Sequence, residues 1–173
     1  MRTTVGAIAL LLIATQALAA LRVSQPAPDF TAKATLGGRE FVFSLSQALK
    51  QGPVVVYFYP AAFTQGCTVE AHEFAAAMPD FKAAGATVIG VSGDDIAKLD
   101  KFSVSECQSK FAVASDGDHK IMTAYDAKVP LLSFAMRTSY VIGQDGKVRF
   151  SYTDMDPDQH VSRTLAALRG LTK

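Results

Sequence analysis

Residues 54–74 constrain the fold more than any other stretch, because a strand pattern, a loop and a helix pattern follow one another there. Val54–Tyr59 is a run of apolar, β-branched and aromatic residues that Pro60 ends, which is typical of a buried strand. Beyond the loop, apolar residues recur at helical spacing, at Ala71, Phe74, Ala75 and Met78. The change of period predicts a strand-loop-helix unit.

Cys67 lies at the junction of this loop and helix. Thr64 is a suitable N-cap, which places Gly66 and Cys67 in the first helical turn. Backbone N–H groups of a first turn lack intrahelical acceptors, and the helix dipole is positive at that end. Both effects favour the thiolate form of Cys67, so this residue is a candidate nucleophile.

The first nineteen residues have the features of a secretory signal. Arg2 precedes an apolar run over Val5–Ala14, and Ala17-Leu18-Ala19 gives the small-x-small order of a cleavage site. We expect a signal peptide over 1–19, cleavage after Ala19, export to the periplasm, and one domain over 20–173. A retained membrane anchor is the alternative, but the apolar run is shorter than the ~20 residues that span a bilayer.

Length and charge limit the remaining function classes. A chain of 173 residues, 49% hydrophobic and 19% charged, suits one ordinary core. Removing the signal takes away one of 17 basic residues and none of the 16 acidic ones, so the mature chain is formally neutral. This balance gives no electrostatic support for a nucleic-acid or membrane-surface partner.

Apolar runs bounded by turn residues predict six further strands, over 30–35, 39–43, 86–92, 111–114, 139–142 and 148–152. The first two and the last two form hairpins, turned at Gly37-Gly38 and at Asp145-Gly146. The remaining strands alternate with helices. This order predicts an α/β protein with a mixed sheet between helices.

Four helices are predicted besides the one that follows Cys67. They begin at Ser44 or Ser46, at Asp94 or Asp95, at Lys120 and at Asp156-Pro157. The second of these carries Cys107 at its far end, and the last ends just before Gly170. Pro79 is expected to interrupt the cysteine helix.

The motif Pro60-x-x-x-Thr64-x-x-Cys67 resembles the active site of the peroxiredoxins, the alkyl hydroperoxide reductase/thiol-specific antioxidant family. Flanking residues make it similar to the bacterioferritin-comigratory, or Q-type, subgroup: Phe63, Gly66, Thr68 and Glu70. Other features of that family follow in order, at Pro26-x-Pro28-Asp29-Phe30, Ser92-Gly93-Asp94, Ser115-Asp116-Gly117 and Arg137 before Ser139–Ile142. The resemblance covers residues 22–170 and implies a thioredoxin-like fold and an antioxidant peroxidase.

Cys67 is, by this resemblance, the peroxidatic nucleophile for hydrogen peroxide and organic hydroperoxides. Such chemistry needs a reactive thiolate and donors aimed at both peroxide oxygens. The resemblance implies that Arg137 stabilises the thiolate, that Thr64 and Gly66 help to hold the peroxide, that Pro60 shields the sulfur, and that Glu70 orients Arg137. Each has a plainer alternative: a cap for Thr64, a surface position for Arg137, a solvated acid for Glu70 and a strand end for Pro60.

Two positions depart from the family pattern. Gln65 stands where the family usually has proline, and His72 stands where many Q-type members carry the resolving cysteine. The resemblance allows Cys107 to take that role, which implies an intramolecular disulfide in a monomer, recycled by a thioredoxin-like or other thiol reductant. The alternative is that Cys107 is an inert buried thiol.

Other uses of the cysteines remain open. A dithiol exchanger would need Cys-x-x-Cys, but position 70 is Glu. An exported binding or structural module would hold a permanent Cys67–Cys107 disulfide. A metal site is not expected, because the two cysteines lie 40 positions apart and His72, His119 and His160 have no chelating spacing. No cofactor is implied.

Overall fold

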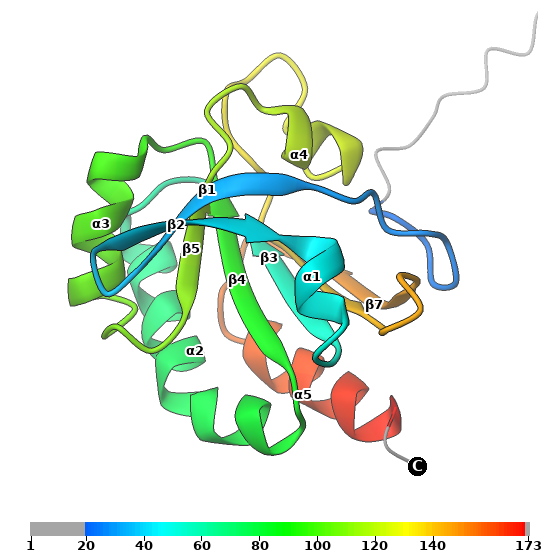
Figure 1. Ribbon diagram of the computed structural model, residues 1–173. Coiled ribbons are helices and arrows are strands. Elements are labelled where there is room, and N and C mark those ends of the chain that lie inside the picture. Colours follow the sequence, from blue (N-terminus) through cyan, green and yellow to red (C-terminus); the bar gives the residue numbers. More distant parts are fainter. Residues whose placement is uncertain (1–19, 172–173) are drawn as a thin grey trace, which may run out of the picture.

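The computed structural model describes residues 20–171, and the export signal predicted over 1–19 lies outside that range. Seven strands form one sheet in the order β2-β1-β5-β4-β3-β6-β7, with helices on both faces (Figure 1). The strands are β1 (Thr31–Leu36), β2 (Arg39–Ser44), β3 (Val54–Phe58), β4 (Thr87–Ser92), β5 (Ala112–Ser115), β6 (Thr138–Ile142) and β7 (Val148–Thr153). The helices are α1 (Leu45–Leu49), α2 (Gln65–Ala83), α3 (Ile96–Ser105), α4 (Lys120–Ala124) and α5 (His160–Leu171).

The sheet has a parallel centre and antiparallel edges. Strands β3, β4 and β5 run parallel and are joined through α2 and α3, whereas β6 pairs antiparallel with β3 and β1 pairs antiparallel with β5. Two hairpins, β1–β2 and β6–β7, form the edges. Every predicted strand is present within one residue at each end, which confirms the mixed α/β architecture.

Strand β3 divides the interior into two cores, because successive side chains point to opposite faces of the sheet. Val54, Val56 and Phe58 pack on the face that α1 and α4 cover, whereas Val55 and Tyr57 pack on the face of α2, α3 and α5. Both faces are covered, which explains why the sequence of β3 is apolar throughout.

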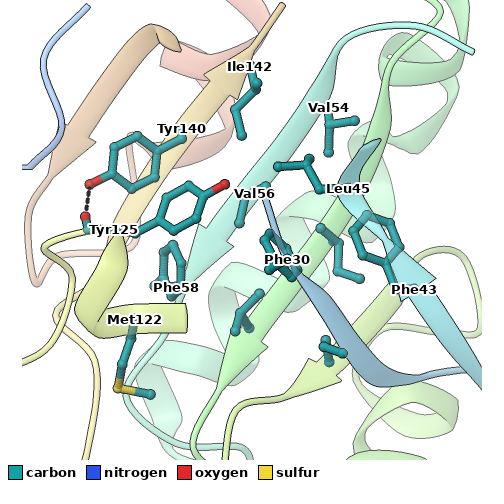
Figure 2. Packing of buried hydrophobic residues seen from close by; sticks show 14 of the residues in the cluster. Phe30, Phe43, Leu45, Val54, Val56, Phe58, Met122, Tyr125, Tyr140 and Ile142 are labelled. Atoms are coloured by element: carbon teal, nitrogen blue, oxygen red, sulfur yellow. Dashed lines mark hydrogen bonds between the residues drawn. The ribbon is translucent and has the colours of Figure 1, made fainter. Parts of the chain in front are cut away.

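Aromatic residues fill the core under α1 and α4 (Figure 2). The Tyr140 hydroxyl donates to the carbonyl oxygen of Tyr125 at 2.5 Å, and the Tyr125 hydroxyl donates to that of Pro28 at 2.8 Å. These two buried tyrosines thus keep their hydroxyl groups paired, unlike Tyr57 and Tyr59 on the other face of the sheet. The second bond also fastens the segment that precedes β1 to this core.

Helices α2 and α3 end at positions that differ from the prediction. Helix α2 continues through Pro79, which is exposed, while Met78 and Phe81 beside it are buried. Packing against the sheet therefore outweighs the backbone hydrogen bond that a proline removes. Helix α3 ends at Ser105, so Cys107 lies beyond the helix and not inside it.

The last helix begins later and ends later than predicted. Its first residue is His160, because Asp154 and Asp156 accept hydrogen bonds from the backbone N–H groups of Asp156 and Asp158 and hold a turn there. At the other end the helix runs through Gly170 to Leu171. Within residues 20–171, no helix is both long and apolar enough to cross a bilayer, and no three metal-binding side chains form a cluster.

Candidate active site

Helix α2 presents Cys67 in its first turn, as predicted. The helix begins at Gln65 with Thr64 in the N-cap position, and Cys67 is only 2% exposed. The Thr64 side chain is exposed and does not cap the helix; its hydroxyl donates to the carbonyl oxygen of Ala61 at 3.0 Å. Pro60 lies partly buried just after β3. The loop between β3 and α2 thus leads directly into the helical turn that carries Cys67.

Asp94 holds this loop in place. One carboxylate oxygen accepts from the backbone N–H of Ala62 at 2.7 Å and from the Ser92 hydroxyl at 2.8 Å, and the other pairs with Lys98 at 2.6 Å. The sequence left Asp94 and Asp95 as alternative helix caps, and the structure shows Asp95 capping α3. Asp94 instead ties the end of β4 to the loop before Cys67.

Arg137 reaches the cysteine from the residue before β6. Its side chain is buried, and Nη2 lies 3.6 Å from the Cys67 sulfur. Gly66 permits this approach, because a Cβ atom at that position would lie 3.0 Å from Nη2. The Nε group donates to the carbonyl oxygen of Met155 at 3.0 Å, which fixes the plane of the guanidinium.

Glu70 is the second partner of Arg137. It lies one turn after Cys67, is fully buried, and accepts from Arg137 Nη1 through Oε2. Burial raises the pKa of Glu70 to about 8, although the neighbouring Arg137 acts in the opposite direction. Burial also acts to lower the pKa of Arg137, but attraction to Glu70 and Cys67 outweighs it and raises the value.

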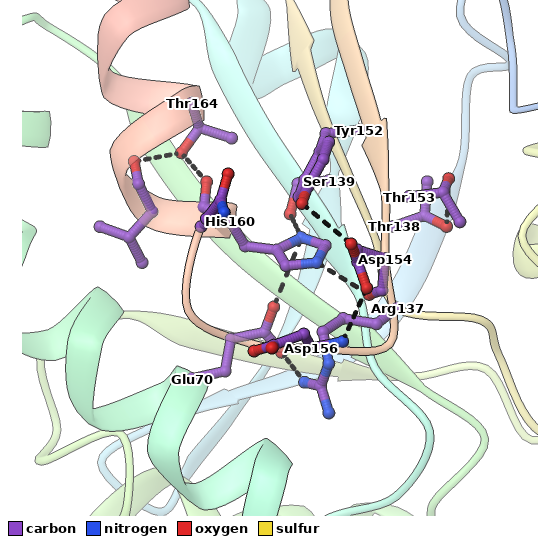
Figure 3. Close-up of polar contacts among 12 residues, drawn as sticks. Glu70, Arg137, Thr138, Ser139, Tyr152, Thr153, Asp154, Asp156, His160 and Thr164 are labelled. Atoms are coloured by element: carbon purple, nitrogen blue, oxygen red, sulfur yellow. Dashed lines mark hydrogen bonds and ion pairs between the residues drawn. The ribbon is translucent and has the colours of Figure 1, made fainter.

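His160 lies behind Glu70, a contact that the sequence analysis missed (Figure 3). Its Nδ1 is 2.8 Å from the Ser139 hydroxyl and 3.7 Å from Glu70 Oε1, and its Nε2 is 3.0 Å from the carbonyl oxygen of Asp154. Burial lowers the pKa of His160 to about 4. His160 shares the buried face of α5 with Thr164 and Leu168, but helical spacing alone does not identify Glu70 as its partner.

Cys107 lies in the same apolar cluster as Cys67 but on a different segment. It is completely buried two residues beyond α3, and both cysteines are free thiols. Burial raises the pKa of the Cys107 thiol well above its usual range, and the neighbouring Glu106 adds to this effect. Cys107 is therefore held as a thiol in the folded state.

The segment around Cys107 contacts α2 through a pair of residues at the protein surface. His72 on α2 lies 2.9 Å from Glu106, although its side chain is 48% exposed. Gln108 and Ser109 follow with φ angles of 51° and 55°, which is unfavourable for residues other than glycine. A surface contact and two strained residues thus flank the buried thiol.

Comparison with known proteins identifies the family. Residues 23–151 match the AhpC/TSA family. A putative chloroplastic peroxiredoxin Q from Oryza sativa subsp. indica is 38% identical over 147 residues, which are 84% of this chain and 65% of that protein. A putative peroxiredoxin bcp from Helicobacter pylori (strain J99) is 31% identical over 154 residues, covering 86% of this chain and 98% of that one. The chain thus spans about two thirds of the rice relative and nearly all of the bacterial one.

Solved structures agree with this match. Peroxidoxin BcpB from Mycobacterium tuberculosis superimposes with a TM-score of 0.80 at 30% identity, over 87% of this chain and 98% of that one. Peroxiredoxin Q from Xanthomonas campestris gives a TM-score of 0.73 at 29% identity, over 83% and 92%. The predicted thioredoxin-like fold is therefore confirmed. The chain belongs to the AhpC/TSA family and groups with its peroxiredoxin Q and bcp members.

Proposed function

We propose that the protein is a thiol peroxidase that reduces hydrogen peroxide and organic hydroperoxides, with Cys67 as the nucleophile. The observation that carries this proposal is the Arg137 guanidinium 3.6 Å from a sulfur in the first turn of α2. A buried cation and free first-turn amides stabilise a thiolate and the charge that develops on the leaving oxygen. Family membership supports the same reaction.

The reaction is a two-electron transfer from sulfur to the O–O bond. The Cys67 thiolate attacks the terminal oxygen of the hydroperoxide, the O–O bond breaks, and the other oxygen leaves with the electron pair and takes a proton from water. Cys67 becomes a sulfenic acid. Arg137 and the Gly66 segment stabilise the departing charge, Thr64 contributes a hydroxyl group, Pro60 limits access of water, and Glu70 orients Arg137.

Cys107 resolves the sulfenic acid in this proposal. Its sulfur attacks the Cys67 sulfur, which releases water and leaves a Cys67–Cys107 disulfide. A thioredoxin-like or other thiol reductant then supplies two electrons and restores both thiols. The cycle needs only one chain, so we propose a monomer.

Local opening must precede this step, because a thiol that is completely buried is a poor nucleophile. The strained residues after Cys107 favour opening. The end of α3 is anchored at Ser103, which is buried and accepts from the backbone N–H of Gly37 at 2.8 Å. Opening therefore has to begin beyond Ser103, where the His72–Glu106 contact is exposed to solvent.

Replacement of Cys67 tests the proposed function directly. With one equivalent of peroxide, the wild-type protein should lose two titratable thiols and consume the peroxide rapidly, whereas Cys67→Ser should do neither. Stopped-flow peroxide consumption and thiol titration measure both. If Cys67→Ser retained a tenth of the wild-type rate of peroxide consumption, Cys67 would not be the nucleophile. If the wild-type protein had no titratable thiols, the two cysteines would form a permanent structural disulfide instead.

Arg137→Ala should slow peroxide reduction by about 10²-fold, as loss of one group that stabilises a developing negative charge typically does. It should also slow alkylation of Cys67 at neutral pH, because the thiolate loses its nearest cation. Arg137→Lys is the matched control, because it keeps the charge but loses the planar set of donors. Its rate of peroxide reduction should lie between those of the wild type and Arg137→Ala. Equal rates in all three proteins would place Arg137 outside the reaction.

Cys107→Ser should still reduce one equivalent of peroxide but should fail to form an oxidised monomer on non-reducing electrophoresis. Glu106→Gln weakens the contact with His72 and should speed disulfide formation without changing the first step. A disulfide-linked dimer of the wild type, or normal turnover of Cys107→Ser with a thioredoxin-like reductant, would exclude Cys107 as the resolving residue.

We also propose that the chain is exported and loses residues 1–19. The charged start, the apolar run and the small residues before Ala20 support this. Mass spectrometry of protein from the envelope of an expressing bacterium should find an N-terminus at or near Ala20. Soluble cytosolic protein that retains Met1 would contradict export.

A further inference from the structure

The polar cluster behind Arg137 contains a carboxylate oxygen without a donor. Glu70 is fully buried, and its Oε1 accepts no hydrogen bond from any residue in the described range. The polar atom that it faces is His160 Nδ1, at 3.7 Å (Figure 3). An ionised carboxylate is costly to bury with one oxygen unpaired. The orientation of Arg137 alone therefore does not explain why Glu70 and His160 are buried together.

The hydrogen bonds of His160 decide what its Nδ1 can do. Its Nε2 lies 3.0 Å from the carbonyl oxygen of Asp154, which can only accept, so Nε2 carries the hydrogen. In a neutral imidazole Nδ1 then has a lone pair, and the Ser139 hydroxyl donates to it at 2.8 Å. The Ser139 hydroxyl thus occupies the one lone pair of Nδ1, and Glu70 Oε1 faces this nitrogen at 3.7 Å without a hydrogen bond, so His160 gives Oε1 no donor.

The charges around Glu70 favour a proton on the carboxyl group. The titratable groups near it are Arg137 before β6, His160 on α5, Tyr57 on β3, Cys67 and Glu73 on α2, and Asp154 and Asp156 before α5. Arg137 is the one cation among these described groups while His160 is neutral. A Cys67 thiolate and an ionised Glu70 would place two negative charges on that single buried guanidinium.

We propose, on the basis of the peroxidase function above, that His160 is a positioning residue for Cys67. Its neutral imidazole offers Glu70 Oε1 neither a positive charge nor a hydrogen-bond donor, so the carboxyl group keeps its proton and Arg137 keeps its positive charge for the thiolate. The same imidazole holds the carbonyl of Asp154, and the carbonyl of the next residue, Met155, accepts from Arg137 Nε. One side chain thus sets both the protonation of Glu70 and the placement of Arg137.

The direction of the two pKa shifts agrees with this arrangement. Burial raises the pKa of Glu70 to about 8 and lowers that of His160 to about 4, so at neutral pH the carboxyl group is protonated and the imidazole is neutral. Glu70 binds its proton more tightly folded than unfolded. Folding stability should therefore fall as the pH rises from the ordinary pKa of a glutamate toward about 8, and should level off above that pH. The rate of peroxide reduction should fall as the pH passes about 8, because the new carboxylate competes for Arg137.

Infrared difference spectroscopy tests the proton without using peroxidase activity. At neutral pH the wild-type protein should show the C=O stretch of a protonated carboxyl group that Glu70→Gln lacks, and the band should disappear as the pH rises through about 8. A neutral-pH spectrum in which Glu70→Gln removes only an ionised carboxylate band would overturn the proposal. Glu70→Gln should also flatten the pH dependence of the unfolding free energy between about pH 4.5 and 8.

Variants of the partners test the role of His160. His160→Gln brings an amide group that can donate a hydrogen bond to Glu70 Oε1 and should shift the midpoint of the Glu70 band to lower pH by about half to one unit, the size expected for one hydrogen bond. Ser139→Ala removes the hydroxyl donor from Nδ1, so that the free lone pair faces Glu70 Oε1, and should shift the midpoint upward. His160→Asn, which keeps an amide oxygen near the Nδ1 position, should restore part of the wild-type value.

Three outcomes separate the possibilities. Unchanged midpoints in both His160→Gln and Ser139→Ala would refute the role of His160. If His160→Gln does not fold, the upward shift in Ser139→Ala still decides the question. If the band shifts as expected but Cys67 does not react with peroxide, the proton arrangement holds and the proposed function alone fails.

Discussion

The buried guanidinium of Arg137 is the interaction on which the rest of the site depends. It lies between a sulfur and a carboxyl group in a region that water does not reach, so its charge is felt strongly by both. Cys67 and Glu70 come from one helix, one turn apart, whereas Arg137 immediately precedes β6, the strand that pairs antiparallel with β3. The sheet must be assembled before these groups meet.

The site is held by the backbone as much as by side chains. Asp94 fixes the loop before Cys67, and the carbonyl group of Met155 fixes the Arg137 guanidinium. Both supports lie on segments that continue directly from the ends of strands. A reactive group held in this way loses little conformational freedom during a reaction. The segment that carries Cys107 is different, because strained residues and a solvent-exposed contact surround it.

The strands were predictable from the sequence because their signals are local: a continuous apolar run for β3, and glycine turns for the hairpins. Helix ends were less predictable, since burial beside Pro79 and the aspartate turn before His160 depend on contacts or competing hydrogen bonds that periodicity does not reveal. In the site, Cys67 was found from its place at a helix start, and Arg137 from the family resemblance. The roles of Asp94 and His160 could not be found, because Asp94 contacts a loop 32 residues away and His160 contacts Glu70 from the last helix.

Successive side chains of β3 point into different cores, so substitutions in this strand fall into two groups. Val55 and Tyr57 lie in the same cluster as both cysteines, whereas Val54, Val56 and Phe58 lie in the cluster on the opposite face. Substitutions on the second face change how much folded protein a cell maintains, and leave the surroundings of the sulfur atoms intact. Substitutions one residue away along the same strand also change the packing of the cluster that holds both cysteines. All five side chains are buried, so every substitution in this strand acts on stability, but only those at Val55 and Tyr57 also act on the surroundings of the sulfur atoms.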